Sequence, residues 1–423
     1  MRSIYVVGST DAIPLSILLP LQLRTFEEPF LPRLKRFKCD RATANFFPFF
    51  PLFLSPETTE IEILFKSTPD IVVAPVINSI PTLCPALDHI TLRGLDLSHV
   101  LTDAVSGLLL ACNPDTLRAF FVDSPLTEEA LQVACQLPNV SELCMVFEGH
   151  TQLPPVSLPN LISLFIEYYD SLDWLQVFHG VTLEKLESVC FSRKTQQVGD
   201  FLEEFETLIT LTTSAQNTLS EIRFLTWRAW HPNYSSLLPF KQLKVLEIQF
   251  SCATRCSSMV DDDVTTALAE AMPKLEILRL GNTPCKTATG STVDGLIGLA
   301  SRCPHLSILR IHFKAATLYN AVRRAVKSPP GDKLVVQREG CDLKVLEVGD
   351  IPIPAHSKPE IAFTLLQIFP HIREVQSTNE EWRAIAGTIM NFRLIGTFVR
   401  HAGKDDYFQL PFDSSDTPPG GLD

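Results

Sequence analysis

Four stretches of this chain decide its fold: residues 243–248 read LKVLEI, residues 275–280 LEILRL, residues 306–311 LSILRI and residues 343–348 LKVLEV. Each stretch places aliphatic residues at a first position and again three and five positions later. The same spacing recurs at less regular copies, and the copies start at residues 34, 58, 87, 117, 140, 161, 186, 219, 243, 275, 306, 343 and 372. Their mean separation of about 28 residues is typical of a repeat solenoid.

The L-x-x-L-x-L spacing identifies the repeated unit as a leucine-rich repeat. Side chains alternate along a strand, so the residues at +3 and +5 from each start share one face and pack into a core. The residues between successive strands have room for one helix. The expected fold class is therefore α/β: a leucine-rich-repeat horseshoe with a parallel concave sheet, convex helices and about 11–13 irregular repeats.

Helix-start signals follow several of the expected strands. Thr102 and Thr127 each precede an acidic residue and an apolar helical pattern, as an N-cap does. A further helix is expected at residues 200–211, and the Phe- and Pro-rich residues 45–54 are expected to pack into the core. We assign residues 1–30 to an N-terminal cap or truncated remnant, residues 31–395 to the repeat domain and residues 396–423 to a flexible C-terminal tail.

Composition limits the possible functions. The 423-residue chain has a net charge of −12, which disfavours binding to nucleic acid. Its 11 cysteines are odd in number and scattered, which is typical of reduced thiols in a cytoplasmic or nuclear protein. The apolar stretch at residues 13–23 is too short to cross a membrane and is interrupted by prolines. We therefore expect neither a nucleic-acid nor a membrane partner.

The chain carries no recognisable catalytic motif, neither G-x-S-x-G nor a phosphate-binding glycine loop. Residues 261–263 are three aspartates that could bind a cation, although charge complementarity with a helix N-terminus explains them equally well. Cys252 and Cys256 lack the tighter paired spacing of a zinc site. We expect no enzyme activity, no catalytic residues, no metal site and no cofactor.

The concave face is the candidate functional surface, because the residues at +2, +4 and +6 of each repeat point away from the core. The +4 positions contain an apolar zone and a charged zone, with a tryptophan and a histidine near the charged one. Exposed aromatic and arginine side chains often dominate protein interfaces. The predicted partner-binding residues are Phe121, Phe165, Arg223, Trp227, Glu247, Arg279, Arg310, His312 and Glu347.

Alternatives remain open for both zones. The charged residues could form a self-neutralising ladder of exposed ion pairs, each worth about 0–1 kcal/mol. The phenylalanines could lie under a loop. Arg279 beside Arg310 favours a bound acid, whereas Glu247 and Glu347 on either side argue against one.

One segment carries more than the general repeat. Residues 293–312 read VDGLIGLASRCPHLSILRIH, and Cys84 with Pro85 repeats its helix-end Cys-Pro, with Met272 in the same place before Pro273. Cys112 and Cys135 occupy similar places. Across about residues 31–378 the chain resembles the cysteine-containing repeats of F-box/LRR proteins, in the diverged form found in fungi. The F-box itself is missing from residues 1–33.

The resemblance implies a non-enzymatic module that recruits substrates to an SCF-type ubiquitin ligase through its concave face. If an F-box lies upstream, a Skp-type adaptor and a cullin ligase are the further partners implied. The alternative is a free-standing leucine-rich-repeat scaffold or inhibitor with no link to a ubiquitin ligase.

Overall fold

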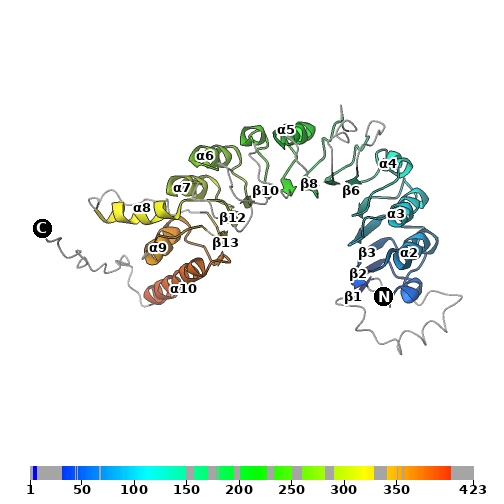
Figure 1. Ribbon diagram of the computed structural model, residues 1–423, viewed down its shortest axis with the longest axis horizontal. Coiled ribbons are helices and arrows are strands. Elements are labelled where there is room, and N and C mark those ends of the chain that lie inside the picture. The colour runs from blue at the N-terminus through cyan, green and yellow to red at the C-terminus, as the bar shows by residue number, and fades with distance from the viewer. Residues whose placement is uncertain are drawn as a thin grey trace.

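The computed structural model describes residues 3–6, 31–42, 44, 46–65, 68–148, 157–169, 178, 181–194, 201–225, 233–249, 260–281, 290–327, 341–349, 351–354 and 357–401. Within these ranges 14 strands form one sheet, and each strand pairs with the next one in the chain. The strands line the inner side of an arch and the helices lie on its outer side (Figure 1). The predicted α/β leucine-rich-repeat horseshoe is confirmed.

The strands lie where the repeat pattern predicts them. Thirteen strands each begin two residues after a predicted repeat start, namely β2 (Arg36–Ala42), β3 (Glu60–Phe65), β4 (His89–Arg93), β5 (Ala119–Val122), β6 (Glu142–Phe147), β7 (Ser163–Tyr168), β8 (Ser188–Arg193), β9 (Glu221–Leu225), β10 (Val245–Gln249), β11 (Ile277–Leu280), β12 (Ile308–Arg310), β13 (Val345–Glu347) and β14 (Glu374–Gln376). The remaining strand, β1 (Ser3–Val6), was not predicted and pairs in parallel with β2. It places part of the expected N-terminal cap in the sheet.

The core is made by the +3 and +5 residues of each repeat. Leu246, Leu278 and Leu309 are register partners on β10, β11 and β12, and none of them is exposed. Burying one such side chain contributes roughly 1.5–3 kcal/mol. The Phe-rich residues 45–54 also contribute as predicted, because Phe46, with Phe47, Phe49 and Phe50 of η2 (Phe47–Leu52), is buried.

The helices lie between strands and differ in length. They are α2 (Asp70–Leu83), α3 (His99–Ala111), α4 (Glu128–Ala134), α5 (Phe201–Thr212), α6 (Asp262–Ala271), α7 (Val293–Arg302), α8 (Ala315–Lys327), α9 (Lys358–Ile368) and α10 (Glu380–His401), with short 3-10 turns at η4 (Thr213–Ala215) and η5 (Tyr234–Leu237). Helix α5 confirms the helix expected at residues 200–211. Helix α10 continues to His401, past the expected domain boundary at residue 395, and residues 402–423 lie outside the described ranges.

One predicted N-cap is confirmed and one is wrong. The Thr127 side chain accepts a hydrogen bond from the Ala130 amide at 3.4 Å and starts α4. Helix α3 instead begins at His99, where Ser98 accepts from the Leu101 amide at 3.2 Å. Thr102 lies inside this helix, since its amide already donates to the Ser98 carbonyl at 2.9 Å. The earlier serine, in extended backbone conformation, is the first residue able to cap the turn.

The helix-end cysteines lie at the ends of convex helices. Cys84, Cys112, Cys135 and Cys303 are the C-cap residues of α2, α3, α4 and α7, and Met272 takes the same place after α6. The Cys303 thiol lies 3.7 Å from the Met272 carbonyl of the preceding repeat. Burial raises the pKa of this thiol to about 12. Cys303 therefore packs against the helix end of the preceding repeat as a neutral thiol.

The aspartates at residues 261–263 stabilise the start of α6 and of its neighbour. Asp261 accepts a hydrogen bond from the Val264 amide at 2.9 Å as the N-cap. Asp262 accepts from Ser291 Oγ at 2.7 Å and from the Thr292 amide and Oγ1 at 2.7 and 2.6 Å. Burial raises the pKa of Asp262, but these hydrogen bonds outweigh it and the net pKa is lowered. The helix-terminus interpretation accounts for both carboxylates.

Candidate functional site

Five of the predicted site residues lie in one row across the concave sheet. Arg223, Glu247, Arg279 and Arg310 are successive register partners on β9, β10, β11 and β12. Glu347 follows on β13, one residue beyond the last paired position of β12 and β13. We call these five residues the charged row. The repeat itself assembles the row, because each member occupies the same position in its own repeat. The contact between Arg279 and Glu347 joins residues 68 positions apart in the chain.

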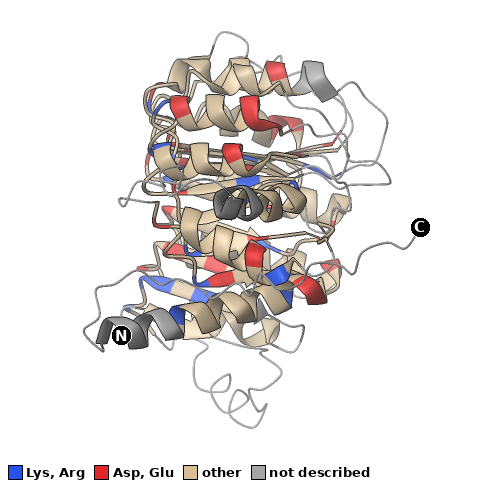
Figure 2. Cartoon of the chain, turned by 90° about the vertical axis from the view of Figure 1, so that its left-hand side faces the viewer, with Lys and Arg blue, Asp and Glu red and all other residues tan. Residues whose placement is uncertain are grey.

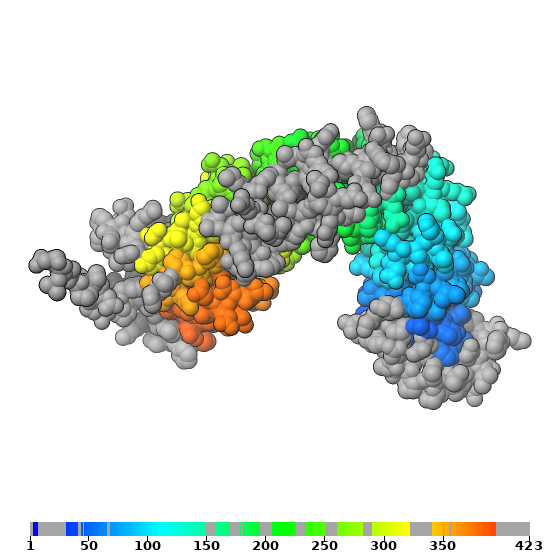
Figure 3. All heavy atoms as spheres, in the orientation of Figure 1, coloured from blue at the N-terminus to red at the C-terminus, as the bar shows by residue number. Residues whose placement is uncertain are grey.

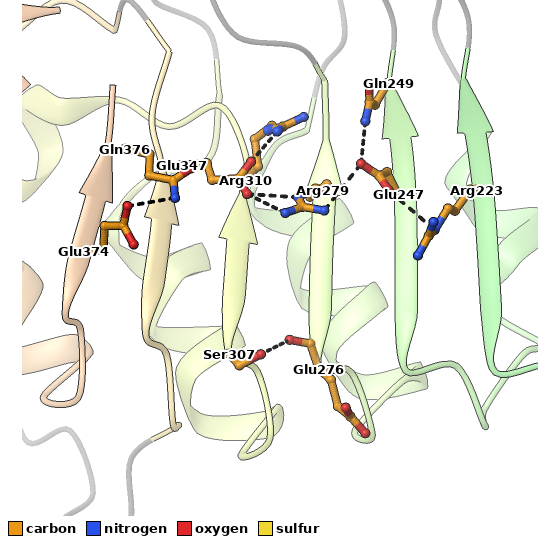
Figure 4. Close-up of polar contacts among 10 residues, drawn as sticks. All are labelled: Arg223, Glu247, Gln249, Glu276, Arg279, Ser307, Arg310, Glu347, Glu374 and Gln376. Carbon is orange, nitrogen blue, oxygen red and sulfur yellow. Dashed lines mark hydrogen bonds and ion pairs between the residues drawn. The ribbon is translucent and has the colours of Figure 1, made fainter. Parts of the chain in front are cut away.

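The N-terminal half of the charged row holds ion pairs within one strand and between neighbouring strands, and Figure 4 shows those between Arg223, Glu247 and Arg279. The Arg223 Nε atom lies 2.8 Å from Glu221 Oε1 on its own strand and 3.6 Å from Glu247 Oε2. Glu247 Oε1 lies 3.6 Å from Arg279 Nη1 and also accepts a hydrogen bond from Gln249. Glu247 therefore links the two arginines on either side of it.

The C-terminal half is built around Glu347. Arg279 donates to Glu347 Oε1 from Nη2 at 2.7 Å and from Nε at 3.0 Å, although β12 lies between their strands. Arg310 contacts the second oxygen, Glu347 Oε2, through Nη2. One carboxylate thus serves two arginines, and the adjacent arginines do not by themselves require a bound acid. This arrangement agrees with the ion-pair ladder that the sequence left open.

The charged row is layered, with carboxylates beneath guanidinium groups. The side chains of Glu247 and Glu347 are 7% and 6% exposed, whereas those of Arg223, Arg279 and Arg310 are 41%, 25% and 18% exposed. Solvent therefore meets mainly the guanidinium groups, even though the charges in the row nearly cancel. Buried ion pairs of this kind are also less screened by salt than exposed ones.

A second row was missed by the sequence analysis, which followed only the +4 positions. Val245, Ile277, Ile308 and Val345 are successive register partners on β10, β11, β12 and β13, two residues before the charged row. All four are half-buried on the concave face. We call them the aliphatic row. The signal was present in the sequence, because all four occupy the +2 position of the clearest repeats.

The aromatic pair lies elsewhere on the same face. Phe121 on β5 and Phe165 on β7 are both half-buried, and their ring centroids are 5.3 Å apart at 49°. They meet across the buried Cys144 of β6, while the Arg93 guanidinium lies 4.5 Å from the Phe121 centroid. Each ring therefore packs against neighbouring side chains of the face. The aromatic pair and the charged row are therefore separate parts of the concave face, divided by β8.

The other two predicted residues differ in what the structure describes. His312 follows β12 and is 4% exposed, and its Nδ1 atom has no hydrogen-bond partner. Leu309, Ile311 and Phe313 between and beside it are in the core, so His312 shares the concave side with Arg310. Trp227 lies in residues 226–232, outside the described ranges.

The two cysteine thiols of the face, Cys144 and Cys190, are neutral. Burial raises the pKa of the Cys144 thiol well above its usual value, and raises that of Cys190 to about 12. Neutral thiols are poor nucleophiles and poor metal ligands. Among the residues that the structure describes, no three His, Cys, Asp or Glu side chains lie close enough to hold a metal ion.

These features define the class of the protein: an open leucine-rich-repeat solenoid with a differentiated concave sheet. Among solved structures, the chain is similar to a leucine-rich-repeat protein of Leptospira interrogans, with 11% identity over 87% of this chain and 100% of that chain, at a TM-score of 0.31. No protein-family model and no curated protein sequence matches the chain.

Three further features accompany this fold. In the described part of the chain, none of the helices is long and apolar enough to span a membrane. On the side shown in Figure 2, positions of Lys and Arg are interspersed with positions of Asp and Glu. The space-filling view shows the arch hollowed between its N-terminal and C-terminal ends (Figure 3).

Proposed function

We propose that this chain is a non-enzymatic protein-recognition module that receives a protein partner on its concave face at β10–β13. The observation that carries the proposal is the aliphatic row, four adjacent half-buried side chains on the face of the sheet that no described helix covers. Helices bury the opposite face of the same strands. Contiguous exposed apolar residues bordered by polar ones are typical of interaction sites.

The chemistry beside the aliphatic row supports binding. The charged row follows two residues further along each strand, about 7 Å away. Its arginines are held in place by Glu247 and Glu347, so little side-chain entropy remains to be lost when a partner binds. Preorganised arginines next to a desolvated apolar centre are common interface hot spots.

The experiment compares two double variants as baits. Ile277→Lys with Ile308→Lys places two charges in the aliphatic row, and Ile71→Lys with Leu110→Lys places two charges on exposed apolar positions of the convex helices. Each bait is purified from the native cells, and the co-purified proteins are quantified by mass spectrometry. We expect the partner to be lost with the first bait and kept with the second. Equal recovery by both baits would show that the aliphatic row is not the site.

The finer role that we propose is substrate recruitment for an SCF-type ubiquitin ligase. It is supported by the helix-end cysteines, since Cys84, Cys112, Cys135 and Cys303 all end convex helices in the manner of F-box/LRR repeats. Recovery of a Skp-type adaptor and a cullin with the wild-type bait is the expected result. A partner recovered without them would favour the free-standing scaffold or inhibitor.

A further inference from the structure

The carboxyl end of β12 and the residues just after it hold buried polar atoms without hydrogen-bond partners. His312 is only 4% exposed, and its Nδ1 atom makes no hydrogen bond. The Nε atom of Arg310, two residues earlier, is buried and unpaired as well. Such atoms are rare in folded proteins, because a buried polar atom without a partner destabilises the fold. A ligand atom that supplied the missing partner would recover part of the lost stability.

The residues that correspond to His312 in the two neighbouring repeats are glycines. Gly281 directly follows β11 and Gly349 lies two residues beyond the end of β13, in the positions that correspond in the repeat to His312 after β12. Neither glycine has a side chain that could reach the imidazole. The repeat thus offers His312 no side-chain partner from these two corresponding positions.

The backbone around His312 is fixed. Its carbonyl accepts a hydrogen bond from the Ser291 amide at 2.9 Å, and the Lys314 amide donates to the Ser291 carbonyl at 2.8 Å. A Cβ atom at Gly290 would lie 2.4 Å from the His312 carbonyl oxygen, so this close approach requires glycine. The imidazole is therefore held on a rigid segment and is not the tip of a loose loop.

The charge presented at this place favours an acidic ligand. Glu347, which neutralises Arg310, lies beneath it with a side chain only 6% exposed, while the Arg310 side chain is 18% exposed. The group that a ligand meets first is therefore the guanidinium, and the imidazole without a partner lies below the surface beside it. Both groups can donate hydrogen bonds. A carboxylate has two oxygens and can accept from both.

We infer that Arg310 and His312 anchor an aspartate or glutamate side chain of the partner protein, beside an aliphatic side chain that packs on Ile277 and Ile308. The inference rests on the proposed function and specifies the chemistry of the partner at that same site. Arg310 and His312 lie two and four residues beyond Ile308, or about 7 and 13 Å along the strand. The acidic and aliphatic residues of the partner should therefore lie within four residues of each other in an extended segment.

The test is a selection of random 12-residue peptides displayed on phage, with the full chain as the target. We expect enriched peptides to carry Asp or Glu within four residues of Leu, Ile or Val. A synthetic copy of the strongest peptide is then measured by fluorescence anisotropy. Changing its acidic residue to the corresponding amide should weaken binding at least tenfold, and this change leaves the protein itself untouched.

Variants of the chain locate the contact. Arg310→Met and His312→Leu should each weaken the acidic peptide at least fivefold, but should hardly affect its amide form. Circular dichroism checks that each variant is folded. Ile308→Lys should abolish binding of both peptide forms.

The outcomes separate the inference from the proposed function. Peptides that depend on Ile308 but carry no acidic residue, or whose acid and amide forms bind equally, would overturn the inference and leave the recognition surface in place. A selection without any enriched peptide, or with peptides indifferent to Ile308→Lys, would overturn both.

Discussion

Replacing Glu347 by glutamine tests whether the charged row is a buried network or a set of surface ion pairs. The carboxylate accepts two hydrogen bonds from Arg279, at 2.7 and 3.0 Å, and one contact from Arg310. Hydrogen bonds to charged groups contribute roughly 1.5–3 kcal/mol each when buried. Since the two arginines are 25% and 18% exposed and water can replace part of the loss, we expect Glu347→Gln to lower the free energy of unfolding by about 2 kcal/mol.

A double-mutant cycle isolates the pair. Arg279→Gln, Glu347→Gln and the double variant are unfolded in urea, and the coupling free energy is expected at about 1–2 kcal/mol. Lys244 and Glu276 are the matched control, because they directly precede β10 and β11 and form an ion pair at 3.2 Å, but with side chains 54% and 48% exposed. Their coupling should stay below about 0.5 kcal/mol. Equal coupling in the two cycles would refute the layered description of the charged row.

Three further predictions concern the scaffold. Asp262→Asn removes a carboxylate acceptor from the α6–α7 junction and should lower the free energy of unfolding by about 1–3 kcal/mol at pH 7. Because the pKa of Asp262 is lowered in the folded state, this stabilisation is present above the unfolded pKa of about 3.9 and is lost as the pH falls through the folded pKa. The urea midpoints of the two proteins should therefore converge in acid. Gly94→Ala should lower the free energy of unfolding by at least about 1–3 kcal/mol in the same assay, because Gly94 has φ +74° and the new Cβ would lie 2.2 Å from the Phe65 carbonyl oxygen. Gly387→Ala is the control and should be neutral or stabilising, because its new Cβ would have nothing within 4 Å. Equal losses of stability in the two variants would contradict the argument. The Cys303 thiol, with its pKa raised to about 12, should react with a thiol reagent at pH 8 only when urea unfolds the chain, and rapid labelling of the native protein at this residue would show that it is not buried.

The sequence determined where the strands lie and which residues share a face. The +3 and +5 aliphatic positions repeat locally, and a strand's period of two then assigns every other position to the opposite face. This is why thirteen strands begin two residues after the predicted starts, and why Glu247 and Arg279 lie in one row. The aliphatic row was equally predictable, because it needed only the +2 positions to be aligned in the same way.

The tertiary structure decided what those shared faces do. Position in a column does not specify which neighbour a long side chain will contact, since an arginine can reach the adjacent strand or the one beyond it. Arg279 passes over β12 to reach Glu347, 68 residues away in the chain, and the burial of that carboxylate depends on the side chains of three strands together. Strand β1 was unpredictable for a similar reason: its four residues carry no repeat pattern, and only the open edge of β2 orders them. Local periodicity thus fixes the order of residues along the sheet, whereas pairing, layering and burial arise only when distant repeats are stacked.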